Sequence, residues 1–482
     1  MIGICFQATF FTVYLSQKYD YYRTGYFDFG SAIQTVWMAS EGHFNALALG
    51  RPITLIVSVL FLLYPHPQTL VAFQSFWIAI GAVPIFLLAR DQLGNQWHAA
   101  AFAGLYLMYP ALWGVNQYEY HDLALSIPFL AFAIYFYSVR RLPFYVLSLG
   151  LALASSPFIV VIAVVLAVSF LIDNYASKSL KHGRYPVLTI CLATLFGVYL
   201  QIVPQMFSYQ LPTLGPSSYT LTGSTLYLNP ATLLSQPLAS LAYAAQLKAI
   251  YLFEILAPVI FLPILALRKF LPALPWVGVV ILYSPSVGAG GVGPVYEYSQ
   301  WSSFLIPFIF IGAIYGFKRI IQSKYFLHQR MMRRGSLLSV MMIISITVAI
   351  FSSGLSPLGK PVTFSVGDSS VPTDFNSTSA LHGVWPSPVQ NYSVLDWFAS
   401  QIPQNYSILT QNPIGSKLWE RIAPVYVFYQ PGYKNVNADA ILIDTQVQGL
   451  CTSCVNTVIS SGNYALYLSY PSEGIFLYFR IR

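Results

Sequence analysis

Long apolar runs separated by short polar turns fill residues 1–353 of the chain. A helix that crosses a bilayer needs about 20 mostly apolar residues, within a range of roughly 17–25. A further apolar stretch at 52–65 is too short to cross, so we expect a re-entrant or interfacial piece there. The runs that predict membrane spans are 2–17, 67–90, 98–116, 122–139, 142–156, 157–173, 187–206, 247–267, 270–286, 301–317 and 336–353.

The pattern changes after residue 353. Residues 354–390 are rich in Ser, Pro, Gly and Thr, which predicts a linker. In 391–482, "SVLDWFASQI" has helical spacing, whereas "YSILTQ", "VYVFYQ", "DAILIDT" and "YALYLSY…GIFLYFR" are typical of strands. The sequence therefore predicts an all-α polytopic membrane domain of about 11 transmembrane helices over 1–353 and a small C-terminal extracytoplasmic α/β or α+β domain over 391–482.

Composition agrees with a membrane protein and argues against a nucleic-acid partner. Hydrophobic residues make up 56% of the chain and charged residues only 8%, whereas a soluble domain carries about 25% charged residues. Much of the surface must therefore face lipid. The formal charge of +8 is not gathered into a basic stripe on a soluble segment, and no nucleic-acid-binding motif is present.

Lysine and arginine positions predict the orientation. If the N-terminus is cytoplasmic and the spans alternate, the outer loops of the membrane domain hold only Lys18, Arg23, Arg51 and Lys248. Cytoplasmic loops are enriched in Lys and Arg, so we expect a multi-pass cell-membrane protein with an extracytoplasmic C-terminal domain. The inner loops then hold Arg90, Arg140, Arg141, Lys178, Lys181, Arg184, Arg268, Lys269, Lys318, Arg319, Lys324, Arg330, Arg333 and Arg334.

Sequence motifs of the C-terminal part fit this orientation. Asn376, Asn391 and Asn405 match the N-glycosylation pattern and fall outside. Cys451 and Cys454 form "CTSC", for which a local disulfide is the expected state in an oxidising compartment. Half of a zinc site is the alternative.

Carboxylates are distributed opposite to the bases. Only Asp91 and Asp173 fall on the inner side. Longer outer loops could explain this, but ionisable groups at membrane depth also mark functional cavities. We favour an outward-facing polar cavity for Asp28 and the 119–122 turn. The carboxylates at or near the outer face are Asp20, Asp28, Glu41, Glu119, Asp122, Glu254 and Glu297.

Asp28 is the strongest candidate for chemistry. It lies in "GYFDFGSAIQ", between Phe27 and Phe29. Partial removal from water makes a carboxylate a better proton acceptor, which suits a general base. The alternative is that Asp28 caps the helix predicted at 31–40, because Asp is a favoured capping residue. We expect that helix to lie along the outer interface.

Glu119, His121 and Asp122 form a second cluster, in the predicted outer turn "NQYEYHD". Two carboxylates and an imidazole can bind a divalent metal or a polar substrate. A solvated hairpin turn is the alternative. A metal would need a further ligand from elsewhere in the chain.

Two arginines and one glutamate complete the candidate set. Arg51 begins the short apolar piece, and Arg23 lies in the same outer loop. Either guanidinium could pair with a lipid phosphate, or simply extend to the interface. Glu297, in "GAGGVGPVYEYSQW", lies at the mouth of the span predicted at 301–317.

These features together resemble the GT-C superfamily, membrane glycosyltransferases that take sugars from polyprenyl-phosphate lipids. More closely, the chain resembles a family of prokaryotic polytopic membrane proteins catalogued as a domain of unknown function. The stretches that carry this closer resemblance are "YFDFGSAIQTVW", "LYPHPQTLVAFQSFWIAIGAVPIFLLAR", "LYLMYPALWGVNQYEYHD", "YEYSQWSSFLIPFIFIGAIYGF", "SQIPQNYSILTQNP" and "ADAILIDT".

The resemblance implies roles for the candidate residues. Asp28 matches the catalytic base of GT-C enzymes, and His121 with Asp122 matches a His-Pro-Glu-like turn that lacks its proline here. The chain also has "LGRP" and "ASSPF" where the closer family tends to show His-x-Ser-Pro and Lys-Glu-Asp. Arg23 or Arg51 would stabilise the departing phosphate.

The implied function is transfer of a sugar from a polyprenyl-phosphate lipid donor to a glycan, lipid or protein acceptor on the outer face. Glu119, His121, Asp122 and Glu297 would contact substrate or assist a divalent metal. The alternatives are a membrane transporter or lipid flippase, in which intramembrane carboxylates couple proton movement, and a catalytically inactive membrane protein.

Overall fold

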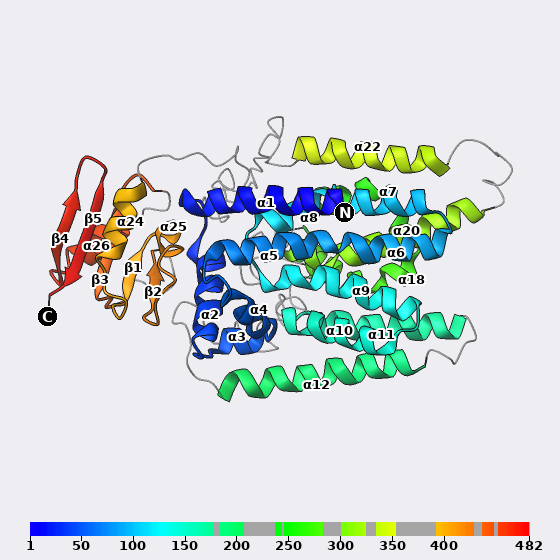
Figure 1. Ribbon diagram of the computed structural model, residues 1–482, viewed down its shortest axis with the longest axis horizontal. Helices are drawn as coiled ribbons and strands as arrows, with labels where there is room; N and C mark the ends of the chain where they lie inside the picture. Colours follow the sequence, from blue (N-terminus) through cyan, green and yellow to red (C-terminus); the bar gives the residue numbers. More distant parts are fainter. Residues whose placement is uncertain are drawn as a thin grey trace.

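The computed structural model describes residues 1–176, 183–206, 237–242, 245–282, 300–323, 334–352, 392–428, 436–447 and 452–481. Helices run along the long axis of the molecule, and a small sheet covers one end of them (Figure 1). The helical part consists of α1 (Ile2–Asp20), η1 (Tyr26–Gly30), α2 (Ser31–Ser40), α3 (Ala46–Gly50), α4 (Ile53–Phe61), α5 (Pro67–Ile80), α6 (Ala82–Leu93), α7 (Gln96–Leu107), α8 (Pro110–Gln117), η2 (Asp122–Leu125), α9 (Ser126–Ser138), α10 (Leu142–Ser155), α11 (Ile159–Ala176), α12 (Arg184–Met206), α15 (Pro237–Ala242), α16 (Ala245–Leu256), η5 (Ala257–Val259), α17 (Leu262–Leu265), α18 (Leu267–Phe270), η6 (Leu271–Ala273), α19 (Leu274–Leu282), η8 (Gln300–Phe304), α20 (Ile306–Gln322) and α22 (Arg334–Ser352).

Three helical stretches are long and apolar enough to cross a membrane, by length and composition. They are Pro67–Leu93, Ile159–Ala176 and Arg184–Pro204. Shorter apolar helices cover 122–138, 142–155 and 336–348 within the described residues. Helix is present in the described part of every predicted span, but the number of crossings, eleven, stays a prediction.

Two of the predicted spans are interrupted. The run at 98–116 is divided into α7 and α8, because Tyr109 is extended before Pro110 and proline disfavours a helical conformation in the residue before it. The run at 247–267 is interrupted between α16 and α17, where Ile260 and Phe261 adopt positive φ values of 48° and 53°.

The short elements of the first loop match their predictions. The helix predicted at 31–40 is α2, and the apolar piece at 52–65 contains the short helix α4. These two helices pack on each other at the end of the bundle nearest the sheet (Figure 1).

The C-terminal sheet is mixed and confirms the predicted strands. It contains β1 (Ile408–Thr410), β2 (Val425–Val427), β3 (Ala440–Asp444), β4 (Tyr464–Tyr470) and β5 (Ile475–Arg480). Their order is β2-β1-β3-β5-β4, with β1 parallel to β2 and β3, and with β5 antiparallel to both β3 and β4. The sequence predicted either an α/β or an α+β domain, and the structure has the α/β arrangement.

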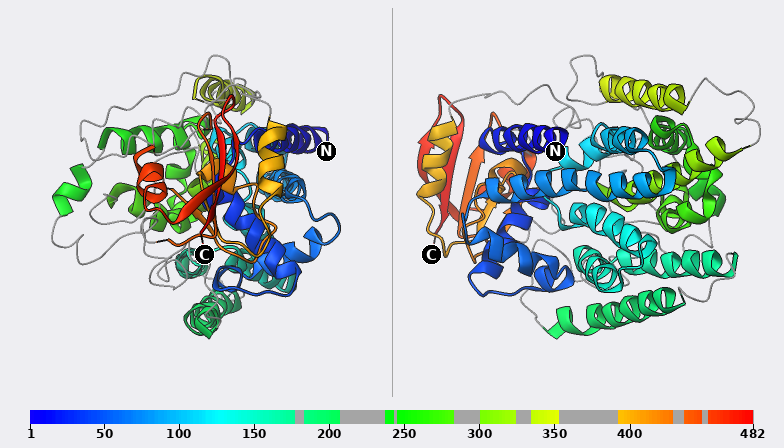
Figure 2. Two further views of the ribbon diagram at one scale, coloured as in Figure 1. Left: turned by 90° about the vertical axis from the view of Figure 1, so that its left-hand side faces the viewer. Right: turned by 45° about the vertical axis from the view of Figure 1, so that its right-hand side comes forward.

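Helices cover both faces of the sheet. Figure 2 shows α24 (Tyr392–Ser400) and α26 (Thr452–Ile459) on opposite sides of it. Every residue of β1 and β3 is buried, as expected for strands covered on both faces. The short helix α25 (Asn412–Gly415) follows β1 and faces the helical bundle.

The core of this sheet also contains residues from the start of the chain. Tyr22 and Tyr26 pack with Leu395, Ile408 and other buried residues on one face of the sheet. The first loop and the C-terminal domain are therefore packed as one unit, and the predicted linker 354–390 between them lies outside the described residues.

Candidate functional site

Asp28 lies in a π-helical turn that leads directly into α2. The Gly30 amide donates to the Gly25 carbonyl over 3.1 Å, five residues back. Single π turns recur at functional sites because they displace one side chain from the regular helical row. Neither η1 nor α2 begins with a side-chain cap, so within this segment Asp28 is not the capping residue that we considered as its alternative role.

The Asp28 carboxylate meets the imidazole of the 119–122 turn. Its Oδ1 atom lies 3.5 Å from Nε2 of His121; the Asp28 side chain is 40% exposed and that of His121 only 6%. The His121 ring packs against the Tyr118 ring, with centroids 5.2 Å apart. The negative charge of Asp28 raises the pKa of the Tyr118 hydroxyl well above its usual value, and burial of this side chain acts in the same direction. The two predicted clusters therefore meet in the structure.

Gln74 of α5 fixes the path of the turn. Its Nε2 donates to the Glu119 carbonyl over 2.6 Å, and its Oε1 accepts from the His121 amide over 2.7 Å. Because Gln74 is fully buried, this pair of bonds holds the backbone on either side of Tyr120. Nδ1 of His121 is buried and has no hydrogen-bond partner among the described residues, so only Nε2 faces Asp28.

Glu119 is engaged in a buried ion pair. Its carboxylate lies 2.6 Å from Nζ of Lys18, at the end of α1, and Lys18 also donates to the Gln117 carbonyl over 3.1 Å. Burial raises the pKa of the Glu119 carboxyl, although the Lys18 charge opposes this. Glu119 also has a positive φ of 73°. The carboxylate is thus turned toward α1.

Asp122 connects the turn to the start of α4. Tyr120 donates to its Oδ1 over 2.7 Å, and Thr54 donates to its Oδ2 over 3.1 Å. Arg51 precedes Thr54 by three residues, just before α4 begins. Asp122 is therefore bonded to the same short segment that carries Arg51.

Among the remaining predicted residues that the structure describes, Arg23 does not join this cluster. Arg23 is half-buried in the turn after α1, and its guanidinium forms no hydrogen bond or ion pair with other described residues. Glu297 lies outside the described residues, as do Asn376, Asn391 and Cys451. Lys18, Thr54 and Gln74 were missed as site residues. The sequence offered a reason to consider Lys18, because it is one of the few Lys or Arg residues in the predicted outer loops.

The side chains do not form a metal site within the described part of the chain. Groups of three or more His, Cys, Asp or Glu that could hold an ion are absent there. Glu119 is paired with Lys18, and both oxygens of Asp122 accept hydrogen bonds. The donor set thus does not fit a divalent cation.

The C-terminal domain packs directly against the segment that carries Asp28. Thr24 and Ser416 hydroxyls lie 2.9 Å apart, and the Tyr22 hydroxyl donates to Asp396. A Cβ atom added at Gly30 would come within 2.8 Å of the Ser416 Cα. Glycine is required at this close approach, two residues after Asp28.

Aromatic and cationic side chains extend the same interface. Trp419 donates to the Tyr19 hydroxyl over 3.1 Å and packs on Phe61 of α4. The Lys417 ammonium lies 3.9 Å from the centre of the Tyr19 ring. The domain thus holds the first loop at several points along its length.

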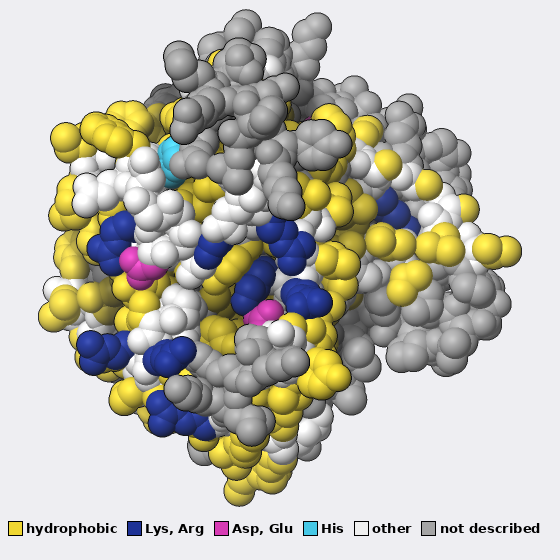
Figure 3. Space-filling model, turned by 90° about the vertical axis from the view of Figure 1, so that its right-hand side faces the viewer, with side chains coloured by type: hydrophobic (Ala, Val, Ile, Leu, Met, Phe, Trp, Pro, Cys, Tyr) yellow, Lys and Arg dark blue, Asp and Glu magenta, His cyan; other side chains and the backbone are white. Residues whose placement is uncertain are grey.

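The opposite end of the helical part is basic. Figure 3 shows Lys and Arg side chains gathered on that end, with few acidic ones among them. Two of the ion pairs there are Lys269 with Asp173 and Arg90 with Asp91. The π turn that carries Asp28 leads into α2 at the other end, where α2 lies near the sheet (Figure 1). His121 of the 119–122 turn lies beside Asp28.

The family of the chain follows from a match over most of its length. No curated protein matches the chain. The model of a family described as "Predicted membrane protein (DUF2079)" matches residues 19–469. This range contains α2, the 119–122 turn, β1, β2, β3 and all of β4 but its last residue. Together with its long apolar helices, the match shows that the chain is a membrane protein belonging to the DUF2079 family.

Proposed function

We propose that this protein is an integral membrane glycosyltransferase of GT-C type, which transfers a sugar from a polyprenyl-phosphate lipid to an acceptor on the outer face. The observation that supports this best is the 3.5 Å approach of Asp28 Oδ1 to His121 Nε2. A half-exposed carboxylate and a buried imidazole from distant segments meet beside the outer domain. This arrangement suits a general base with a positioned partner.

In the proposed reaction, an acceptor hydroxyl attacks the anomeric carbon of the donor sugar. The bond between that carbon and the phosphate oxygen breaks, and the lipid phosphate leaves with the bonding electrons. Asp28 takes the hydroxyl proton. His121 holds the carboxylate in place through Nε2, because Gln74 fixes its backbone. His121 is therefore a positioning residue.

Arg51 is the residue that we assign to the departing phosphate. A guanidinium forms two-point contacts with phosphate oxygens and would stabilise the negative charge that develops there. Asp122, fixed by Tyr120 and Thr54, would hold the start of α4, which follows Arg51. Glu119 would hold the turn through Lys18 rather than contact the substrate. Arg23 and Glu297 remain candidate substrate contacts.

The charge distribution supports the orientation in this proposal. The basic end would face the cytoplasm, in accord with the positive-inside rule, as would the N-terminus. The end with Asp28 and the C-terminal domain would then be extracytoplasmic, with eleven crossings. Lipid-linked sugars presented in the outer leaflet would reach Asp28 from the membrane.

The test compares Asp28→Asn with Asp20→Asn. Both variants remove one carboxylate from the same region, but Asp20 is exposed at the end of α1. The purified full chain is reconstituted in liposomes with dolichyl-phosphate mannose or dolichyl-phosphate glucose as donor and with α-linked mannotriose or cellotetraose as acceptor, and release of dolichyl phosphate is measured. We expect Asp28→Asn to lower turnover by a factor of about 10²–10⁴, and Asp20→Asn to leave it within twofold. Equal turnover by Asp28→Asn and the wild type would refute the assignment.

A further inference from the structure

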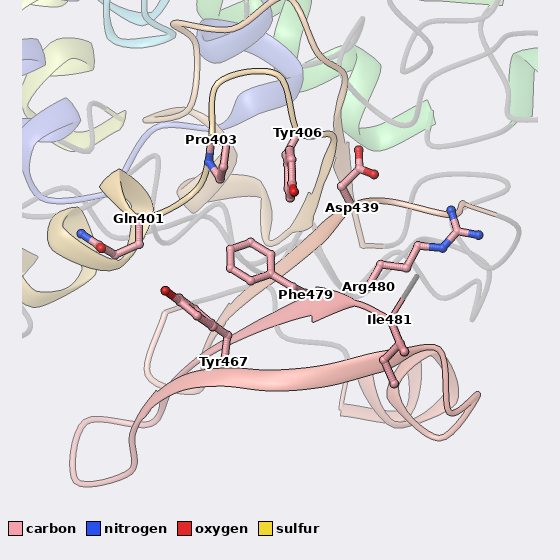
Figure 4. Close-up of a pocket in the computed structure, with 8 residues that line it drawn as sticks. All are labelled: Gln401, Pro403, Tyr406, Asp439, Tyr467, Phe479, Arg480 and Ile481. Carbon is pink, nitrogen blue, oxygen red and sulfur yellow. The ribbon is translucent and has the colours of Figure 1, made fainter.

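A separate hollow lies on the C-terminal domain, away from the residues assigned above. Its volume is ≈ 660 Å³. It is formed where β1 and β3 begin and where β5 ends (Figure 4). Most pockets that bind small molecules have volumes of about 300–1,000 Å³, so the hollow can hold one or two sugar rings.

Three aromatic rings form the centre of this hollow. Figure 4 shows Tyr406, Phe479 and Tyr467 in a row. The centroids of the Phe479 and Tyr406 rings are 5.8 Å apart in an edge-on arrangement, and those of the Phe479 and Tyr467 rings are 4.8 Å apart in a tilted one. The Tyr467 side chain is 59% exposed. Exposed aromatic surface of this kind provides flat contact area for an apolar face of a ligand.

Polar groups stand on both sides of the rings. Gln401 lies on one side, with Asp439 and Arg480 on the other (Figure 4). Asp439 is fixed, because its Oδ2 accepts from the Ser407 amide over 2.9 Å and from the Ser407 hydroxyl over 2.7 Å. Carboxylate, amide and guanidinium together offer donors and acceptors, while the two charges cancel.

We propose that this hollow is a carbohydrate-binding site. A pyranose ring has apolar C–H faces, which fit aromatic rings, and an edge of hydroxyl groups, which both donate and accept hydrogen bonds. A phosphate-bearing ligand would favour a surplus of positive charge, whereas this hollow has one acid and one base. The balance of the lining therefore favours a neutral saccharide.

Hydrogen bonds connect the hollow to the segment that carries Asp28. The Arg421 guanidinium donates to the Tyr406 carbonyl over 3.0 Å, and the Arg421 carbonyl accepts from Gln34 Nε2 over 2.7 Å. Gln34 in turn accepts from the Tyr26 hydroxyl over 2.5 Å, in the π turn of Asp28. On the proposed function, the saccharide in the hollow belongs to the acceptor.

Binding is measured on the full chain in nanodiscs by saturation-transfer NMR and calorimetry. The probes are cellotetraose and α-linked mannotriose, with tetraglycine as the peptide comparison. Tyr467→Ala and Arg480→Gln remove one ring and one charge at exposed positions. Tyr470→Ala is the matched control, because Tyr470 is an exposed tyrosine of the same strand that does not line the hollow.

We expect at least one saccharide to bind, with tenfold weaker binding in both pocket variants and unchanged binding in Tyr470→Ala. Absence of saccharide binding, or equal binding by Tyr467→Ala and the wild type, would overturn the site. Tighter binding of tetraglycine would replace it with a peptide site. Asp28→Asn separates the two proposals, because saccharide binding should survive in that variant whether or not transfer activity exists.

Discussion

The Lys18 ammonium lies 2.6 Å from the Glu119 carboxylate, and both side chains are almost excluded from solvent. The pair joins the end of α1 to the turn that carries His121. In a buried pair, each charge depends on the other, since water does not replace a missing partner. The position of the site therefore depends on an interaction outside its reacting groups.

Lys18→Met should lower the free energy of unfolding by about 3–5 kcal/mol, because it leaves the Glu119 carboxylate buried without its partner. The measurement is chemical unfolding of the full chain in detergent micelles. The double variant with Glu119→Gln should recover part of this loss, since it removes the unpaired charge. A loss below about 1 kcal/mol in the single variant would contradict the structural role of the pair.

The backbone of Glu119 gives a second prediction. Its φ of 73° costs an L residue roughly 1–2 kcal/mol relative to the right-handed region, and glycine avoids most of this cost. In the Lys18→Met background, Glu119→Gly should therefore be about 1 kcal/mol more stable than Glu119→Ala. Equal unfolding free energies for the two variants would show that the turn relaxes when the ion pair is absent.

Trp419 should contribute strongly to the attachment of the C-terminal domain. It is 5% exposed, and its ring contacts Trp37 and Phe61 of the helical part. Trp419→Ala should lower the free energy of unfolding by about 3–5 kcal/mol and accelerate proteolytic release of the domain. Trp397→Ala is the control, because Trp397 is 51% exposed. The importance of this contact is refuted if the two variants release the domain equally fast.

Lys417 should make this attachment pH-dependent. Burial lowers its pKa below the ordinary value of 10.5, although Asp396 and Asp20 oppose the shift. Between the lowered pKa and 10.5, the unfolded chain binds more protons than the folded one, so stability rises with pH in that window. The melting temperature of the wild type relative to Lys417→Met should therefore rise as the pH increases toward 10.5. A constant difference would contradict the buried position of the ammonium.

Local sequence patterns predicted the elements well. The five strands, α24 and α2 were each expected within a few residues, because their periods are short and their boundaries carry Gly, Pro or polar residues. The stretch 52–65 was expected only as a re-entrant or interfacial piece, and α4 lies within it. The break before Pro110 was missed, although a proline inside an apolar run often marks it. The prediction followed the apolar composition instead, because one continuous helix over 98–116 has the length that is needed to cross a bilayer.

Contacts between distant segments were predicted less well. One such contact was anticipated, because Asp28 and the 119–122 turn were expected near each other, and Asp28 lies beside His121. Other contacts were not anticipated. The assignment of Glu119 to substrate overlooked Lys18, whose approach depends on how α1 packs against α5 and α8. Likewise, nothing in the local pattern of the first loop indicates that Tyr22 and Tyr26 belong to the core of the C-terminal domain.

That shared core has a consequence for biosynthesis. Tyr22 and Tyr26 leave the ribosome long before the strands that bury them are made. The π turn with Asp28 can therefore reach its final packing only after β1, β2, β3 and β5 have been synthesised and have met the first loop. A chain that stops before β3 would lack the residues that support its own reactive carboxylate.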